Sequence, residues 1–143
     1  MTLVDANILL YAYEAGGAEQ DRASRWLERL GESGETIALP WVVLWTFIRV
    51  STSPRVRDPP LPAKQAFSIV GEWIDDPSTV LLNPGPAHAR ILERLVVEYR
   101  VTGARMTGAI LAALAIEHGA VLASADRDFA RFTELRWVNP LAE

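Results

Sequence analysis

The sequence contains no cysteine, only one lysine and only two histidines, and these absences narrow its chemistry. Without cysteine the chain can form neither a disulfide nor a thiolate metal centre, so any metal ion must be held by oxygen ligands or by His88 and His118. The chain also lacks a G-x-x-x-x-G-K phosphate loop and a G-x-S-x-G nucleophile elbow. Thiol catalysis, P-loop nucleotide hydrolysis and hydrolysis by an elbow serine are therefore excluded.

Long apolar runs are missing as well. No stretch reaches the roughly 18 apolar residues of a membrane span, and Met1 leads directly into an apolar segment rather than a charged leader. Half of the 143 residues are nevertheless hydrophobic, enough to bury a sizeable core. We expect one domain covering residues 1–143, soluble, cytoplasmic and without contact to a membrane.

The charge balance does not favour tight nucleic-acid binding, because the net charge is −4 and nucleic-acid binders are usually basic. Thirteen of the 14 basic residues are arginine and one is Lys64. Arginine suits phosphate recognition, although a GC-rich genome produces the same bias. An acidic site that carries divalent cations can still bind phosphates.

Short apolar segments alternate with helical patterns along the whole chain. The segments are apolar on both faces, which is typical of a parallel sheet covered by helices on both sides. We therefore predict a three-layer α/β fold with a short, mainly parallel central sheet. The expected strands are 3–4, 36–39, 79–82, 120–123 and 136–138, and the main helices are 19–30, 41–51, 63–74, 87–100 and 107–118. Trp41 and Trp45, one turn apart, are expected in the core first and in the groove of a dimer or a partner protein second.

Two acids follow two of these strands. Asp5 follows Leu3–Val4, and Asp126 follows the strand 120–123, with Ser124 before it and Asp128 after it. Each acid could simply be a helix N-cap. Neighbouring parallel strands, however, end at the same edge of the sheet, where ligands bind in α/β proteins. Carboxylates gathered there repel one another, and a divalent cation relieves that repulsion.

The oxygen ligands indicate Mg²⁺ or Mn²⁺, and the reaction that fits them is metal-assisted phosphodiester hydrolysis. A phosphatase of the haloacid-dehalogenase type also begins with an acid after the first strand. It would need a second acid two residues later and a catalytic lysine, where this chain has Asn7 and only the peripheral Lys64.

Five segments carry a resemblance that spans the chain. Residues 4–9 (VDANIL) resemble the first motif of PIN-domain ribonucleases, and residues 48–55 (IRVSTSPR) resemble their central helix and loop. Residues 111–119 (LAALAIEHG) with 124–132 (SADRDFARF), and 135–140 (LRWVNP), resemble the C-terminal half of VapC-type toxins. The chain is thus identified as a member of the PIN-domain family.

The resemblance implies a Mg²⁺- or Mn²⁺-dependent endoribonuclease of a type II toxin–antitoxin pair, with RNA as substrate. Such proteins are usually homodimers and are held inactive by a cognate VapB-like antitoxin. The family's first and fourth-motif acids correspond to Asp5 and Asp126, and Asp128 is a further candidate ligand. Asn7 and Ser124 correspond to supporting positions. Arg49, the one charge on an apolar helix, is our candidate for contact with a site carboxylate or an RNA phosphate.

Two positions depart from the family pattern. Thr46 stands where many members have Glu, and Gly108 stands where the third acid is expected, three residues before Leu111. Glu117 is too far along the same helix to replace that acid. Loss of a metal-binding carboxylate should slow hydrolysis by orders of magnitude. Either this copy is naturally impaired, or the residue at position 108 was replaced deliberately. The alternative reading is a degenerate PIN module that binds antitoxin or RNA without cutting it.

Overall fold

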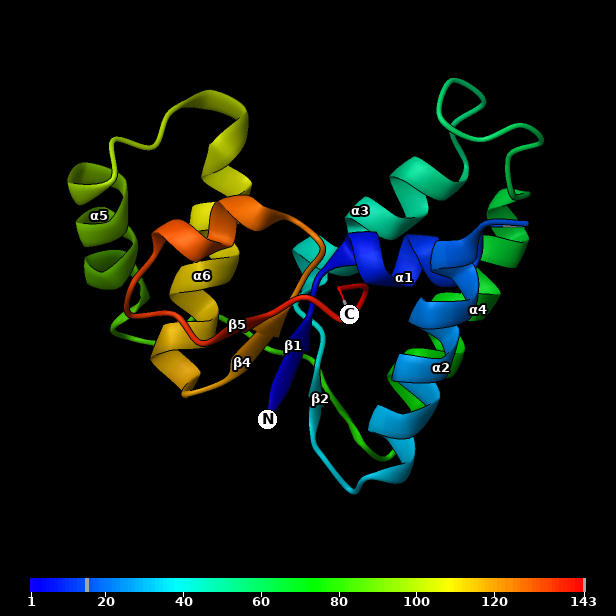
Figure 1. Cartoon of the computed structure of the whole chain (residues 1–143), viewed down its shortest axis with the longest axis horizontal. Helices are drawn as coiled ribbons and strands as arrows, with labels where there is room; N and C mark the ends of the chain where they lie inside the picture. Colours follow the sequence, from blue (N-terminus) through cyan, green and yellow to red (C-terminus); the bar gives the residue numbers. More distant parts are fainter. Residues whose placement is uncertain (15, 143) are drawn as a thin grey trace.

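A five-stranded parallel sheet forms the centre of the computed structural model, which describes residues 1–14 and 16–142. The strand order is β3-β2-β1-β4-β5, so β1 is central and β4 lies directly beside it (Figure 1). In the register of that pair, Val4 lies opposite Ala123. The strands are β1 (Thr2–Val4), β2 (Ile37–Ala38), β3 (Thr79–Val80), β4 (Val121–Ala123) and β5 (Trp137–Val138).

Helices cover both faces of the sheet, as the α/β prediction requires. Figure 1 shows the helices in two groups, on opposite sides of the sheet. The first group is α1 (Ala6–Ala12), α2 (Ala18–Glu32), α3 (Trp41–Ser51) and α4 (Ala63–Asp75). The second group is α5 (His88–Glu98) and α6 (Met106–His118), with the short 3-10 helices η1 (Gly103–Arg105) and η2 (Arg127–Arg131) nearby in the sequence. The three-layer α/β fold and its parallel sheet are therefore confirmed.

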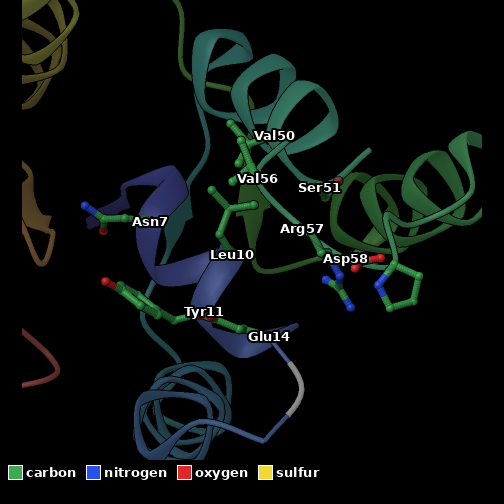
Figure 2. Close-up of a pocket in the computed structure, with 10 residues that line it drawn as sticks. Asn7, Leu10, Tyr11, Glu14, Val50, Ser51, Val56, Arg57 and Asp58 are labelled. Atoms are coloured by element: carbon green, nitrogen blue, oxygen red, sulfur yellow. The ribbon is translucent and has the colours of Figure 1, made fainter. Parts of the chain in front are cut away.

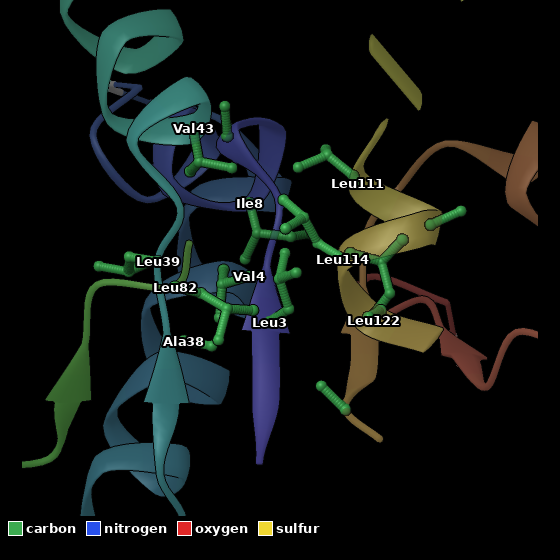
Figure 3. Close-up of a cluster of buried hydrophobic side chains, with 14 of the residues drawn as sticks. Leu3, Val4, Ile8, Ala38, Leu39, Val43, Leu82, Leu111, Leu114 and Leu122 are labelled. Atoms are coloured by element: carbon green, nitrogen blue, oxygen red, sulfur yellow. The ribbon is translucent and has the colours of Figure 1, made fainter. Parts of the chain in front are cut away.

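The core lies on both sides of β1. Leu3 and Val4 are fully buried and pack between Ile8 of α1 on one face and Leu114 of α6 on the other (Figure 3). Four alanines of α6 are buried, and their small side chains let this helix approach the sheet closely. Gly119 ends α6 with φ of 65°, a left-handed conformation that glycine adopts without strain.

Several element boundaries differ from the prediction by one or two residues. Only Thr79–Val80 pairs as β3, although Leu82 beyond it is still buried. Helix α5 ends at Glu98 rather than near residue 100, because Arg100 has φ of 52°, outside the helical region.

The placement of the two tryptophans in the core was wrong. Trp45 is 62% exposed and Trp41 is 38% exposed, and their rings stack on each other with centroids 6.2 Å apart. Helix α3 instead buries Val43, Leu44 and Phe47. The helix is apolar nearly all round, so its sequence does not distinguish the buried face from the exposed one.

None of the described helices combines the length and the apolar character needed to cross a lipid bilayer.

Candidate metal and catalytic centre

The pairing of β1 with β4 brings the two predicted strand ends together. Asp5 directly follows β1, and its backbone N–H donates to the carbonyl of Ala123, the last residue of β4, at 2.9 Å. Ser124 and Asp126 follow Ala123 in sequence. The carboxyl ends of two adjacent central strands therefore carry Asp5 and Asp126, as predicted.

Ser124 links these strand ends through its hydroxyl group. This fully buried side chain donates a hydrogen bond of 2.7 Å from Oγ to Oδ2 of Asp5. The same Oγ accepts from Nδ2 of Asn7 and from the backbone N–H of Asp126, each at 3.0 Å. One hydroxyl thus ties the end of β1, the start of α1 and the segment after β4 into one rigid cluster.

Asn7 completes this cluster. Its Nδ2 also donates to Oδ2 of Asp5 at 3.3 Å, and its Oδ1 accepts from the backbone N–H of Ala125 at 3.2 Å. The predicted supporting positions, Asn7 and Ser124, therefore lie against Asp5 and hold its carboxylate in one orientation.

Both acids are also N-caps, the alternative that their sequence left open. Oδ1 of Asp5 accepts from the backbone N–H of Ala6 at 2.7 Å, and Oδ1 of Asp126 accepts from that of Asp128 at 2.9 Å. Capping occupies only one oxygen of each carboxylate. Among the described residues, none donates a hydrogen bond to Oδ2 of Asp126, which leaves that oxygen available to a cation.

Burial raises the pKa of Asp5 above its ordinary value, and the negative charge of Asp126 raises that pKa further. Hydrogen bonds from Ser124 and Ala6 act in the opposite direction by favouring the charged form. A partly desolvated carboxylate beside a second one is an environment in which a bound cation would favour ionisation.

Both acids line one cavity of about 270 Å³, together with Gly108, Asp128 and Arg105. The Cα of Gly108 faces usable space, since a Cβ there would meet only the Phe129 ring, at an ordinary contact distance of 3.7 Å. Position 108, where the family's third acid is expected, therefore lines the same cavity as Asp5 and Asp126, and a Cβ fits there.

The donor set suits a weakly held magnesium or manganese ion. Within residues 1–14 and 16–142, no three His, Cys, Asp or Glu side chains are grouped closely enough to form a complete cage. Mg²⁺ commonly binds through one or two carboxylates and keeps several waters, so Asp5 and Asp126 meet this lower requirement. A third carboxylate at position 108 would be the natural addition.

Asp128 lines the same cavity, but its carboxylate faces the guanidinium group of Arg105. Its Oδ2 is 3.8 Å from Nε of Arg105, the residue that precedes α6. Arg105 lies between the predicted helices 87–100 and 107–118 and was not among the predicted site residues. Its place one helical turn before position 108 was the available signal, because residues three apart share a helix face.

Two other residues lie away from this centre. Arg49 is exposed on α3 and does not line the cavity, and no hydrogen bond or ion pair of the described residues joins it to an acid. Glu117 instead accepts from the backbone N–H groups of Gly85 and Ala87, at 2.8 and 2.9 Å. As expected, it does not supply the missing carboxylate.

A parallel sheet with acids after two adjacent central strands matches the architecture of the PIN domain, whose family model matches residues 2–135. The chain therefore belongs to the PIN-domain family, in its VapC-type branch. It is 41% identical to Ribonuclease VapC37 of Mycobacterium tuberculosis, over 99% of each chain. It is 38% identical to Ribonuclease VapC33 of the same organism, over 100% of each chain.

Solved structures show the same fold. VapBC2 from Rickettsia felis, bound to a DNA fragment from its promoter, has a TM-score of 0.72 at 20% identity and covers 96% of this chain and 97% of its own. FitAcB from Neisseria gonorrhoeae has a TM-score of 0.69 at 16% identity, with full coverage of both chains.

Proposed function

We propose that this protein is the toxin of a type II toxin–antitoxin pair and cleaves RNA with Mg²⁺ or Mn²⁺. The observation that carries the proposal is the hydrogen-bonded cluster of Asp5, Asn7 and Ser124 beside Asp126 at one sheet edge. Relatives named as VapC ribonucleases, at 38–41% identity over the whole chain, support the same activity.

In this proposal Asp5 and Asp126 hold the divalent ion. When bound, the ion lowers the pKa of a coordinated water and offsets negative charge on the phosphate. Ser124 and Asn7 fix the orientation of the Asp5 carboxylate through their hydrogen bonds. Arg105, at the cavity wall, supplies positive charge for an RNA phosphate, while Asp128 orients Arg105 or serves as a further ligand.

The substrate would be single-stranded or loop RNA, because cleavage needs an unstacked backbone that can enter the site. We propose a cognate VapB-like antitoxin as the inhibitor and the cytoplasm as the compartment. A homodimer is the expected assembly, and the exposed pair of Trp41 and Trp45 is an apolar surface suited to such an interface.

The second candidate is a degenerate module that binds antitoxin or RNA without cleavage. Gly108 favours it, since the site then has no carboxylate from α6. Loss of that side chain would weaken the binding of the ion more than it would disturb the fold, because Cβ space is open at this position.

The test restores the acid. Gly108→Asp should raise Mg²⁺- or Mn²⁺-dependent cleavage of a labelled RNA by at least roughly the 10- to 100-fold that changes around metal ligands typically cause. Gly31→Asp is the matched control, because it adds the same side chain to an exposed position of α2 with open space around it. Asp5→Asn in the Gly108→Asp background should abolish the gain.

Two results would decide for the degenerate module. In the first, neither the parent nor Gly108→Asp cleaves RNA with either ion. In the second, Asp5→Asn changes neither metal binding nor the growth of cells that express the protein, compared with the parent.

A further inference from the structure

A second hollow, of about 410 Å³, lies beside the metal centre and shares Asn7 with it. It is formed by α1, by the end of α3 and by the loop at residues 56–59. In Figure 2 the side chains of Leu10, Val50 and Val56 meet between α1 and α3. The volume is within the range of small-ligand pockets, and this apolar floor suits the flat face of an aromatic ring.

Polar groups surround that floor. Tyr11 comes from α1, Glu14 from the bend that follows α1, and Arg57 and Asp58 from the loop. Among the described residues, none makes a hydrogen bond or an ion pair to the side chain of Tyr11, Glu14, Arg57 or Asp58, and the Tyr11 ring stacks on no other ring. The hollow therefore offers one aromatic face, donors and acceptors that the fold itself does not use.

Arg57 carries most of this argument because it is partly buried and has no partner. None of its guanidinium nitrogens is among the buried side-chain atoms without a partner in the described residues, so these donors remain accessible to an incoming acceptor. The two nearby carboxylates of Glu14 and Asp58 both lie farther than ion-pair distance from it in the described structure. An arginine held in this way is prepared for an acceptor that a ligand brings.

The hollow is also placed correctly for a substrate of the metal centre. Asn7 contacts Asp5, and Tyr11 follows four residues later, about 6 Å along α1. Figure 2 shows Asn7 and Tyr11 projecting from the same side of that helix. A nucleotide next to a phosphate at Asp5 could thus place its base against Tyr11.

We propose that this hollow is a nucleobase subsite, selective for guanine, for the nucleotide next to the cleaved phosphate; this inference rests on the proposed ribonuclease function. Guanine presents two adjacent acceptors, O6 and N7, which an arginine fork such as Arg57 binds in a bidentate way. Its other edge presents the N1–H and N2–H donors, which match the carboxylate of Asp58 or Glu14. Tyr11 supplies the stacking surface.

The test measures affinity, so it does not depend on cleavage. The probes are fluorescent pentaribonucleotides of uridine that carry guanosine, adenosine or uridine at the centre, and binding is followed by fluorescence anisotropy in Mg²⁺, with probe integrity checked on a gel. The parent should bind the guanosine probe roughly tenfold more tightly than the others. Arg57→Ala should remove this preference, and Tyr11→Ala should weaken all three probes by roughly 5- to 100-fold.

Arg55→Ala is the matched control, because Arg55 is an exposed arginine of the same loop that does not line the hollow. It should keep the preference for guanosine. Equal melting temperatures of the three variants and the parent establish that each variant is folded.

The proposal is overturned if Arg57→Ala keeps the guanosine preference, or if Arg55→Ala and Arg57→Ala lose affinity equally. It is also overturned if Arg57→Ala weakens binding of an antitoxin while leaving all RNA affinities unchanged. A lost preference in Arg57→Ala without cleavage by Gly108→Asp supports the subsite and refutes the nuclease. Cleavage by Gly108→Asp with an unchanged guanosine preference in Arg57→Ala supports the nuclease and refutes the subsite.

Discussion

Ser124→Ala is the substitution that tests the hydrogen-bonded cluster most severely. The Oγ atom of this fully buried serine makes three hydrogen bonds, to the Asp5 carboxylate, the Asn7 amide and the backbone N–H of Asp126. Alanine keeps the backbone and nearly the same volume but removes all three. The carboxylate then loses its 2.7 Å donor, and two N–H groups lose their shared acceptor.

The expected cost follows from these three bonds. A hydrogen bond between neutral groups contributes about 1 kcal/mol to stability, and one to a charged group contributes about 1.5–3 kcal/mol. Asn7 still reaches Asp5 and Ala125, so part of the cluster remains satisfied. We therefore expect a loss of about 2–4 kcal/mol in the free energy of unfolding, which corresponds to a fall of about 6–12 °C in melting temperature for a chain of this size.

Ser51→Ala is the matched control for this measurement. Ser51 is as deeply buried, but its hydroxyl makes only a long local bond of 3.4 Å to the carbonyl of Ile48 in the preceding helical turn. Its removal should cost less than about 1 kcal/mol. Urea unfolding of parent, Ser124→Ala and Ser51→Ala, in EDTA so that no divalent ion contributes, gives the three free energies.

The pH dependence adds a second readout. Burial raises the pKa of folded Asp5, so its ionisation destabilises the metal-free fold, and stability falls as pH rises through that raised pKa. The Ser124 bond opposes the shift, so the deficit of Ser124→Ala should be larger at pH 7 than near pH 4. A Ser124→Ala deficit no larger than that of Ser51→Ala, or one independent of pH, would refute the reasoning.

Three further predictions concern the rest of the fold. Gly85→Ala should cost about 1–3 kcal/mol in the free energy of unfolding, measured in urea, because its Cβ would lie 2.7 Å from Oε2 of Glu117. Glu117→Ala should relieve that clash, so strictly additive costs in the double variant would contradict the prediction. The hydrogen bond from Gly85 lowers the pKa of Glu117, so Glu117→Gln should reduce the melting temperature at pH 7 and match the parent once pH falls below that lowered pKa. Phe47→Ala should cost about 3–5 kcal/mol in the free energy of unfolding, because this fully buried ring packs on Tyr13 and Trp73. Trp45→Ala, at an exposed position of the same helix, should change that free energy by less than about 0.5 kcal/mol. Similar costs for the two variants would contradict the assigned faces of α3.

The sequence predicted the architecture well because its strands are apolar on both faces and its helices are periodic. The shared edge of Asp5 and Asp126 followed from one rule, that neighbouring parallel strands end on the same side of a sheet. The hydrogen bonds among Asp5, Asn7 and Ser124 could not follow from that rule. They depend on the register that sets Val4 opposite Ala123, and register is a property of the assembled sheet.

Helix α3 shows where the sequence was uninformative. Its residues are apolar on nearly every face, so no periodicity marks the side that carries Trp41 and Trp45 as exposed. Arg49 was singled out as the only charge of that helix, but the fold places it on the solvent side, away from the acids. Arg105 was missed because a break between helices gives no sign of the cavity beside it.

The second hollow illustrates the same limit at longer range. Its walls come from α1 and from a loop more than 40 positions later, at residues 56–59. Nothing in either segment alone indicates that Arg57 is partly buried and lines the same hollow as Tyr11. Only tertiary packing brings an unused guanidinium group, an aromatic ring and the metal centre into one region.

The central claim is that Asp5 and Asp126 together hold a divalent ion, and calorimetric titration with Mn²⁺ tests it most directly. The parent should bind Mn²⁺, and Asp126→Asn should weaken that binding by at least about tenfold. Asp75→Asn, a change of the same type at the exposed end of α4, should bind as the parent does. Equal Mn²⁺ affinity in the parent and in Asp126→Asn would contradict the account.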